Sequence, residues 1–207
     1  MTQIIGLVGY AQTGKDEAAK TLAELGWKRV SFADGVREAL YALNPSVFVD
    51  PRMQIKWGVS DAAGLDYIKL DFIVDRVGWE VAKQNYYVRE LLQRMGTEAG
   101  RDIHGQDCWV NRAMRRADDL PQVVVTDVRF PNEAAAIVAR GGLLVRVERP
   151  GVGPVNGHVS DTGVAEIECH EKWVNDGDLH TWRKKVQENL KKLVAEVPPR
   201  PDSIITQ

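Results

Sequence analysis

One short glycine motif constrains the fold of this chain more than any other feature of the sequence. Gly9 and Gly14 are separated by four residues, and Lys15 follows, which is the G-x-x-x-x-G-K spacing of a phosphate-binding loop. The apolar run over residues 4–8 predicts a buried strand before the motif. Apolar residues recur at helical spacing after it, up to Gly26, which is placed to end a helix. Strand, glycine loop and helix are the context that this motif requires.

The residue types of the motif suit a bound anion. Gly9 and Gly14 let the backbone approach a ligand closely and turn its N–H groups inward. The next helix directs its positive end to the same place, and Lys15 adds a mobile charge that can follow a phosphoryl group. Asp16 stands where Ser or Thr is usual, and its carboxylate is a hard oxygen ligand for Mg²⁺. The alternative interpretation is an ordinary glycine turn with a chance lysine and a capping-type aspartate.

Composition excludes several classes of protein. The chain has 207 residues, of which 44% are hydrophobic and 27% charged, as is usual for one globular domain. The net charge of −2 gives no general attraction to polymeric nucleic acid or to an anionic membrane. We expect no signal peptide and no membrane span, because the first strand begins at once and no apolar run is long enough. Cys108 and Cys169 predict free thiols in a cytosol-like protein.

Strands and helices alternate along the chain, which predicts a mostly parallel sheet covered on both faces. Further strands are predicted at residues 27–33, 123–127, 143–148 and 172–174. Helices are predicted at residues 34–44 (capped by Asp34), 88–101, 107–117, 131–140 and 178–196 (capped by Asp178). Residues 45–120 are interpreted as a helical insertion, 150–163 as a loop that could act as a lid, and 197–207 as a tail.

The strand at residues 123–127 is the second strong signal, because Asp127 stands at its carboxyl end. Ligands bind beyond that end of the strands in open α/β sheets, so Asp127 is a candidate for holding Mg²⁺. The alternative is an ordinary aspartate that caps the next turn. Arg129, two residues on, could bind a phosphate with both arms of its guanidinium, or it could form a salt bridge to Asp127 or Glu133.

Other arginines allow two interpretations each. Basic residues surround Trp109 in the sequence, at Arg101, Arg112, Arg115 and Arg116. They could form a phosphate clamp beside an aromatic platform, or a solvated helix face with a core tryptophan, which we favour for the last two. Arg146 and Arg149 flank the predicted loop and could close over phosphates. A solvated position is favoured for Arg146, and the two interpretations are balanced for Arg149.

Two other kinds of site are not supported. Residues 104–108 and 168–171 lack the paired spacing of a structural zinc site. His158, Ser160 and Asp161 could supply a hydrolase triad, but the sequence has no G-x-S-x-G elbow.

Several segments together resemble one known family, the deoxynucleoside monophosphate kinases of tailed bacteriophages, which have the P-loop kinase fold. The matching segments are GYAQTGKD (9–16), SFAD (31–34) with Arg37, LQRMGTEAGR (92–101) with Trp109, TDVRFPNE (126–133), GG (141–142) with VRVERP (145–150), and HVSD (158–161). They occur in order and span most of the chain except residues 45–88. The first segment identifies only the P-loop superfamily. The G-T-E-x-G-R and D-V-R-F-x-N-E segments narrow the resemblance to this one family. The last departs from the H-x-S-E pattern of the family.

The resemblance implies a single P-loop kinase domain over residues 1–207, with a five-stranded, mostly parallel sheet in a three-layer α/β fold. It also implies transfer of the γ-phosphoryl group of ATP to a deoxynucleoside monophosphate, with Mg²⁺. Cofactor-binding residues would be Gly9, Ala11, Gln12, Thr13, Gly14, Lys15, Asp16 and Arg149. Catalytic residues would be Lys15, Asp127 and Arg129, and Mg²⁺ would be held by Asp16 and Asp127. Substrate-binding residues would be Asp34, Arg37, Thr97, Arg101, Trp109 and Arg129, three of them in the insertion. The resemblance also leads us to expect a homodimer in the cytoplasm. If a phage encodes the chain, this would be the cytoplasm of the host cell.

Two alternatives remain open. The G-K-D ending also occurs in P-loop kinases for other small acceptors, such as a coenzyme precursor or phosphomevalonate. A hydroxyl acceptor would need a base near the γ-phosphate, for which Asp34 is the one obvious candidate. A nucleotide-binding protein without phosphotransfer would not need the acceptor arginines. No N-K-x-D element for reading guanine is present, which counts against a GTPase.

Overall fold

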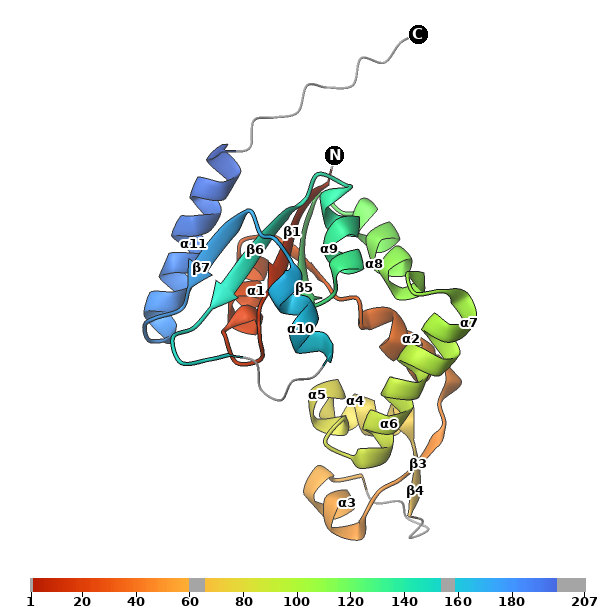
Figure 1. Cartoon of the computed structure of the whole chain (residues 1–207). Coiled ribbons are helices and arrows are strands. Elements are labelled where there is room, and N and C mark those ends of the chain that lie inside the picture. Colours follow the sequence, from red (N-terminus) through yellow and green to blue (C-terminus); the bar gives the residue numbers. More distant parts are fainter. Residues whose placement is uncertain (1, 60–65, 154–158, 197–207) are drawn as a thin grey trace. The chain divides into compact units, whose positions relative to one another are not determined.

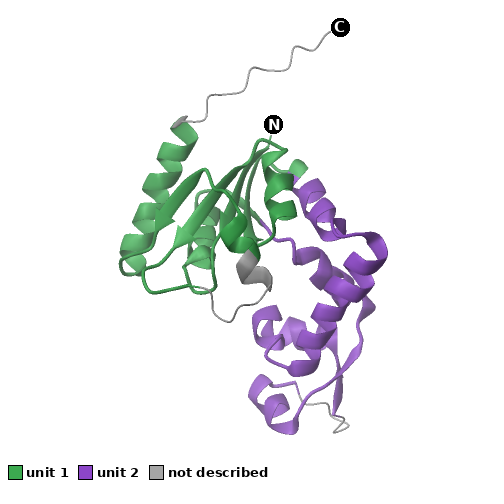
Figure 2. Ribbon diagram, in the orientation of Figure 1, with its two compact units in different colours: residues 1–29, 118–207 green, residues 30–117 purple. Residues whose placement is uncertain are grey.

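The computed structural model describes residues 2–59, 66–153 and 159–196, with the backbone alone for 159–162 and 196. The chain divides into two compact units, which Figure 2 colours separately. Unit 1 comprises residues 1–29 and 118–207, and unit 2 comprises residues 30–117. The predicted tail at 197–207 and His158 lie outside the described residues.

A five-stranded sheet in the order β2-β5-β1-β6-β7 forms the centre of unit 1 (Figure 1). Strand β1 pairs in parallel with β5 and β6, and β6 pairs in parallel with β7. Because parallel strands end at one edge, the loops after β1, β5 and β6 meet there. The predicted five-stranded, mostly parallel sheet is confirmed, although its second strand is shorter than residues 27–33. The strands are β1 (Gln3–Val8), β2 (Lys28–Val30), β5 (Gln122–Val128), β6 (Leu143–Glu148) and β7 (Glu171–Val174).

Helices cover both faces of this sheet, because successive side chains of a strand point to opposite sides (Figure 1). They are α1 (Lys15–Glu24), α9 (Pro131–Val138), α10 (Val159–Glu166) and α11 (Leu179–Glu196). Ile5 and Leu7 of β1 pack in one buried cluster with side chains of α1 and α11. Gly6 faces α9, since a Cβ added to it would lie 2.7 Å from Ile137. Each fully buried aliphatic side chain in such a core contributes about 1.5–3 kcal/mol. The expected three-layer α/β architecture is therefore confirmed.

Unit 2 is mainly helical, with one small antiparallel sheet of two strands. Its helices are α2 (Asp34–Leu43), α3 (Pro51–Trp57), α4 (Leu70–Val77), α5 (Trp79–Ala82), α6 (Tyr86–Arg94), the π-helix η1 (Met95–Arg101), α7 (Asp102–His104) and α8 (Cys108–Asp118). The small sheet consists of β3 (Ser46–Phe48) and β4 (Tyr67–Lys69). Its central pair, Val47 and Ile68, is buried in a cluster with Leu40, Leu70 and Ile73.

The prediction of a helical insertion did not include these two strands. Val47 and Ile68 face each other, and backbone bonds at 2.8 Å from Val49 N to Asp66 O and 3.0 Å from Leu70 N to Pro45 O extend the pairing. Each strand has only three residues, which is too short to display the alternation that predicts a strand.

The predicted helix over residues 88–101 is also corrected, because α6 ends at Arg94 and a π-helix follows. The indole N–H of Trp109 donates to the carbonyl oxygen of Gly96 at 2.9 Å. A side-chain donor that captures a helix carbonyl is one of the known causes of a local change in helix geometry. Gly100 lies directly under the same ring, since a Cβ added to it would overlap the indole of Trp109.

Residues 150–163 are not entirely the loop that their glycines and prolines predict. Helix α10 begins at Val159, while 154–158 lie outside the described residues. The guanidinium of Arg146 on β6 donates to the carbonyl oxygens of Val164, at 3.1 Å, and Ile167. The prediction of a solvated Arg146 is therefore wrong, because this side chain fastens the end of α10 to the sheet.

Candidate functional site

The glycine loop occupies residues 9–14, between the end of β1 and the start of α1. Gly14 stands at the N-cap of α1 with φ at +101°, a conformation that residues with a Cβ rarely adopt. The hydroxyl of Thr13 donates to the carbonyl oxygen of Tyr10 at 3.0 Å, which closes the loop on itself. The predicted sequence of strand, loop and helix is confirmed, with Lys15 as the first residue of the helix.

Lys15 reaches back across this loop. Its Nζ donates to the carbonyl oxygen of Gly9 at 2.6 Å and to that of Tyr10. Burial, and after it the positive charge of Arg129, lower the pKa of Lys15 from 10.5 to about 8, while Asp16 and Asp127 oppose the shift. These three charged groups therefore lie within electrostatic reach of one ammonium. The structure brings together all the residues of unit 1 that were predicted to be catalytic or metal-binding.

Asp127 and Arg129 are placed by the end of β5. Asp127 is half-buried as the penultimate residue of the strand, and Arg129 lies just after the strand with an exposed side chain. The backbone N–H groups of Arg129 and Phe130 donate to Oε2 of Glu133, at 2.8 and 3.1 Å, and Glu133 is only 4% exposed. The buried Glu133 carboxylate therefore fixes the backbone that carries Arg129.

A cavity of about 190 Å³ adjoins the glycine loop. It is lined by Gly9, Tyr10 and Thr13, by residues 146–150 with Val152, and by Val174 at the end of β7. Arg149, the predicted cofactor-binding arginine, is exposed at this cavity. Pockets for whole ligands are usually larger, about 300–1,000 Å³, so this volume suits one part of a nucleotide next to its phosphates.

Asp16 and Asp127 suit the Mg²⁺ ion that the family resemblance implies. Both carboxylates lie near enough to Lys15 to influence its pKa, and Asp16 is exposed in the first turn of α1. Mg²⁺ is commonly bound by one or two carboxylates together with substrate phosphates and water. In the described part of the chain no group of three or more His, Cys, Asp or Glu side chains could hold an ion without such a substrate.

The remaining predicted substrate-binding residues lie in unit 2. Asp34 is the first residue of α2 and not its N-cap, which is Ala33, and this corrects the capping prediction. The Oδ2 atom of Asp34 accepts a hydrogen bond of 2.9 Å from the backbone N–H of Ser31. Arg37, one turn later, lies 3.2 Å from Oε1 of Glu80 in an ion pair whose glutamate is largely exposed.

Thr97, Arg101 and Trp109 belong to one local arrangement around η1. Thr97 is exposed and Arg101 is half-buried, and both lie on the π-helix. The ring of Trp109 packs against Gly100, and its N–H is bound to Gly96. This fixes the indole firmly, so any contact with a ligand would be made by a preorganised ring.

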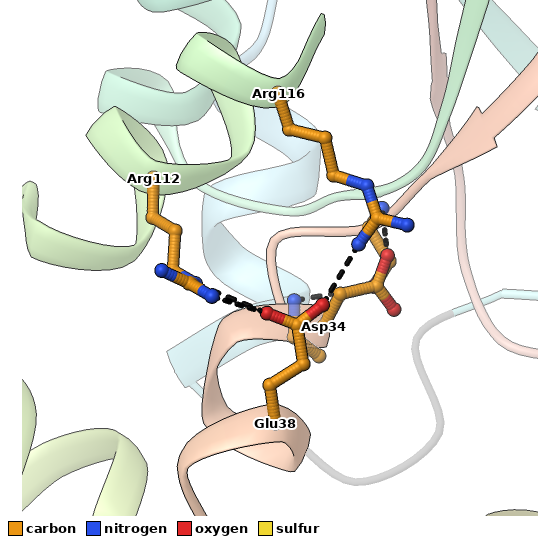
Figure 3. Close-up of polar contacts among 6 residues, drawn as sticks. Asp34, Glu38, Arg112 and Arg116 are labelled. Atoms are coloured by element: carbon orange, nitrogen blue, oxygen red, sulfur yellow. Dashed lines mark hydrogen bonds and ion pairs between the residues drawn. The ribbon is translucent and has the colours of Figure 1, made fainter.

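Two arginines of the basic cluster around Trp109 form ion pairs with one glutamate. Figure 3 shows Arg112 and Arg116, one turn apart on α8, directed to the carboxylate of Glu38 on α2. Arg116 Nη1 lies 2.8 Å from Oε1, and Arg112 binds Oε2. The hydrogen bond from Arg112 is the main cause that lowers the pKa of Glu38. All three side chains are exposed, so these arginines form a surface ion-pair network of modest energy.

Three residues of the site were missed by the sequence reasoning. Glu133 was considered only as a salt-bridge partner of Arg129, although its position three residues after Phe130 fits a helix-capping pattern. Asn175 and Trp182 donate to carbonyl oxygens of the glycine loop. No sequence signal could have found these two, because they lie more than 160 residues from their acceptors.

The fold and the site together define a P-loop kinase. The glycine loop follows the central strand, and counting only the strands of this sheet gives the order 2-3-1-4-5, which is that of P-loop kinases. The family model "Deoxynucleotide monophosphate kinase" matches residues 36–186, and the chain belongs to this family.

Comparison with individual proteins gives the following relatives. A protein of Acanthamoeba polyphaga mimivirus named "Putative deoxynucleotide monophosphate kinase" is 28% identical over 178 residues, covering 81% of this chain and 85% of the relative. Dephospho-CoA kinase from Campylobacter jejuni has a TM-score of 0.46 at 11% identity, over 93% of this chain and 98% of that one. The APS kinase of Mycobacterium tuberculosis has a TM-score of 0.39 at 14% identity, over 92% and 97%. Across the described residues, every helix is too short or too polar to span a membrane.

Proposed function

We propose that this protein transfers the γ-phosphoryl group of ATP to a deoxynucleoside monophosphate, giving the diphosphate and ADP. One observation carries the proposal: Lys15, Asp16, Asp127 and Arg129 gather beside a glycine loop in a chain of the deoxynucleotide monophosphate kinase family. In the cell this activity would supply nucleotide precursors.

The reaction requires little acid–base catalysis by the protein. An oxygen of the acceptor phosphate is already a nucleophile, so positioning and charge neutralisation carry most of the catalysis. On ATP binding, the Lys15 ammonium would exchange the carbonyl oxygens of Gly9 and Tyr10 for phosphate oxygens. Arg129, exposed on a backbone held by Glu133, would bind the acceptor phosphate. Mg²⁺, held by Asp16 and Asp127, would neutralise charge on the nucleotide phosphates.

Residues of unit 2 would bind the acceptor nucleotide. Arg37 is a candidate for its phosphate, because the ion pair with the exposed Glu80 is of the kind that contributes at most about 1 kcal/mol and is readily exchanged. Arg101 and Thr97 on η1 are further candidates, and the fixed ring of Trp109 would contact the base or the sugar. A site that encloses the two nucleotides together would exclude water from the reaction.

A kinase for a hydroxyl acceptor is the second candidate, and one contact disfavours it. Such an acceptor needs a general base, and Asp34 was the one obvious candidate. Its carboxylate accepts the backbone N–H of Ser31 at 2.9 Å, which ties the group to the start of its own helix. A phosphate acceptor needs no such base.

Assembly and location are proposed on the family resemblance alone. We infer a homodimer in the cytoplasm that acts on a nucleoside monophosphate, with no polymeric nucleic acid and no membrane as partner. Light scattering coupled to size-exclusion chromatography tests the dimer, and a single mass of 23.1 kDa at working concentration would contradict it.

One assay tests the proposed activity. The protein is incubated with Mg-ATP and a panel of nucleoside and deoxynucleoside monophosphates, and diphosphate formation is followed. We expect at least one deoxynucleotide to be phosphorylated well above the rate of ATP hydrolysis without acceptor. If no acceptor exceeds that background, the proposal is wrong.

Matched variants connect the activity to the site. Lys15→Ala should abolish transfer and leave the fold intact, whereas Lys20→Ala removes an exposed lysine from the same helix and should change little. Arg37→Ala should raise the KM for the acceptor, and Arg115→Ala, on an exposed face of α8, is its control. Full activity in Lys15→Ala would remove the glycine loop from the mechanism.

A further inference from the structure

Two side chains from the C-terminal part of the chain donate hydrogen bonds to the backbone of the glycine loop. Asn175 Nδ2 donates to the carbonyl oxygen of Thr13 at 3.0 Å, and Trp182 Nε1 donates to that of Gly14 at 3.1 Å. Both donors are buried, at 6% and 2% exposure. They leave no room for a side chain at Gly14, where a Cβ would lie 2.5 Å from Nδ2 of Asn175.

Both donors stand on rigid parts of unit 1. Asn175 directly follows β7, and its backbone N–H donates to the carbonyl oxygen of Glu148 at 2.8 Å, which continues the pairing of β6 with β7. Trp182 lies in the first turn of α11, and its ring belongs to the buried cluster that contains Leu22 of α1. Asp178 caps this helix by accepting the Thr181 N–H at 2.8 Å. The two donors therefore have fixed directions.

These hydrogen bonds determine how two peptide groups of the loop are turned. A trans peptide is planar, and its C=O and N–H bonds point in opposite directions. When Asn175 binds the carbonyl of Thr13, the N–H of Gly14 must point away from Asn175. When Trp182 binds the carbonyl of Gly14, the N–H of Lys15 must likewise point away from Trp182. A hydrogen bond to the carbonyl also polarises the peptide and makes its N–H a stronger donor.

We propose that Asn175 and Trp182 are positioning residues of the nucleotide site, which aim the N–H groups of Gly14 and Lys15 at the bound phosphates. The inference rests on the proposed function for the identity of the nucleotide as ATP. It predicts that the two residues act on phosphate binding and not on the acceptor.

Trp182 offers the cleaner probe of this idea. The carbonyl oxygen of Gly14 also accepts the N–H of Ala18 at 3.0 Å, so Trp182→Phe removes the indole donor without leaving that oxygen unpaired. The phenyl ring keeps most of the buried apolar volume. Trp27→Phe is the matched control, because Trp27 is 4% exposed in the same cluster and makes no hydrogen bond to residues 9–15 in the described structure.

Calorimetric titration with Mg-ATP and with tripolyphosphate, in the absence of acceptor, measures the effect. Trp182→Phe should weaken both ligands about tenfold, which corresponds to the loss of one hydrogen bond's contribution. Trp27→Phe should stay within about twofold of the wild type for both ligands. In the kinase assay, Trp182→Phe should raise the KM for ATP and leave the KM for the acceptor unchanged. Asn175→Asp, which is isosteric and lacks the amide donor, should reproduce the loss if Trp182→Phe does not fold.

Each result bears on the proposal. Wild-type affinity for tripolyphosphate in Trp182→Phe or Asn175→Asp would overturn it, and so would an equal loss in Trp27→Phe, which would point to core packing. An equal rise in both KM values would overturn it as well. If the wild type binds ATP and the variants weaken it but no acceptor is phosphorylated, the proposed function fails while the positioning role stands. Failure of the wild type to bind either ligand would overturn both.

Discussion

Raising the pH from 7 to 9 should weaken ATP binding about tenfold, because it removes the proton of Lys15. The pKa of Lys15 is lowered to about 8, first by burial and then by the positive charge of Arg129. At that pKa about nine in ten Lys15 side chains are protonated at pH 7 and about one in ten at pH 9. Only the charged form neutralises phosphate, so the apparent Kd should increase by the ratio of these populations.

Isothermal titration in two buffers with different ionisation enthalpies provides the assay, because it counts the protons taken up on binding. A bound polyphosphate favours the charged ammonium and restores its proton. Proton uptake per bound ATP should therefore rise from about 0.1 at pH 7 to about 0.9 at pH 9. Lys15→Arg is the control: its guanidinium stays charged throughout this range, so its affinity should change little with pH.

The pH dependence of the free energy of unfolding provides a second test, because the lowered pKa of Lys15 fixes the direction in which that free energy should change. The unfolded chain keeps the ordinary Lys15 pKa of 10.5, so between about pH 8 and 10.5 the unfolded state binds more protons than the folded state. The contribution of Lys15 to the free energy of unfolding should therefore increase with pH in that window. A constant Kd from pH 7 to 9 together with no proton uptake would refute the argument from burial and from Arg129.

Three further predictions concern the surroundings of the site. Arg129→Gln removes the second cause of the lowered pKa, so the midpoint of the pH dependence should move above its wild-type value; an unchanged midpoint in the same titration would contradict the electrostatic contact. Gly163→Ala places a Cβ 2.5 Å from the backbone oxygen of Arg129 and should lower both kcat and the melting temperature, whereas Gly153→Ala, whose Cβ would have no atom of the described residues within 4 Å, should change neither. Gly100→Ala should displace the ring of Trp109, costing about 1–3 kcal/mol in urea unfolding and altering tryptophan fluorescence; wild-type values of both would show that the ring is not held there.

The parts of the fold that the sequence predicted well are those with local causes. The phosphate-binding loop depends on glycines and a lysine within eight residues, and strand β5 depends on a run of β-branched residues before Asp127. Asp178 caps α11 through a hydrogen bond that spans three residues. Each of these features can be recognised from its own segment.

The parts that the sequence did not predict depend on partners that are distant along the chain. Helix α6 gives way to a π-helix where the indole of Trp109 takes the carbonyl of Gly96, thirteen residues earlier. Helix α10 includes a glycine because Gly163 packs against the backbone of Arg129. Arg146 was predicted to be solvated because its acceptors, Val164 and Ile167, lie 18 and 21 residues further along the chain. The roles assigned to Arg37, Arg101 and Trp109 stay predictions.

The two hydrogen bonds that Asn175 and Trp182 donate to the glycine loop also affect when, during its synthesis, the protein becomes able to bind nucleotide. They join Thr13 to Asn175 and Gly14 to Trp182, across 162 and 168 residues. A nascent chain that has exposed only β1 and α1 from the ribosome carries the complete glycine motif but neither donor. A ligand that binds only the finished site stabilises only the finished fold. On the proposed positioning role, a bound nucleotide would therefore stabilise this protein late, once α11 has been translated and docked, and would not guide its first folding steps.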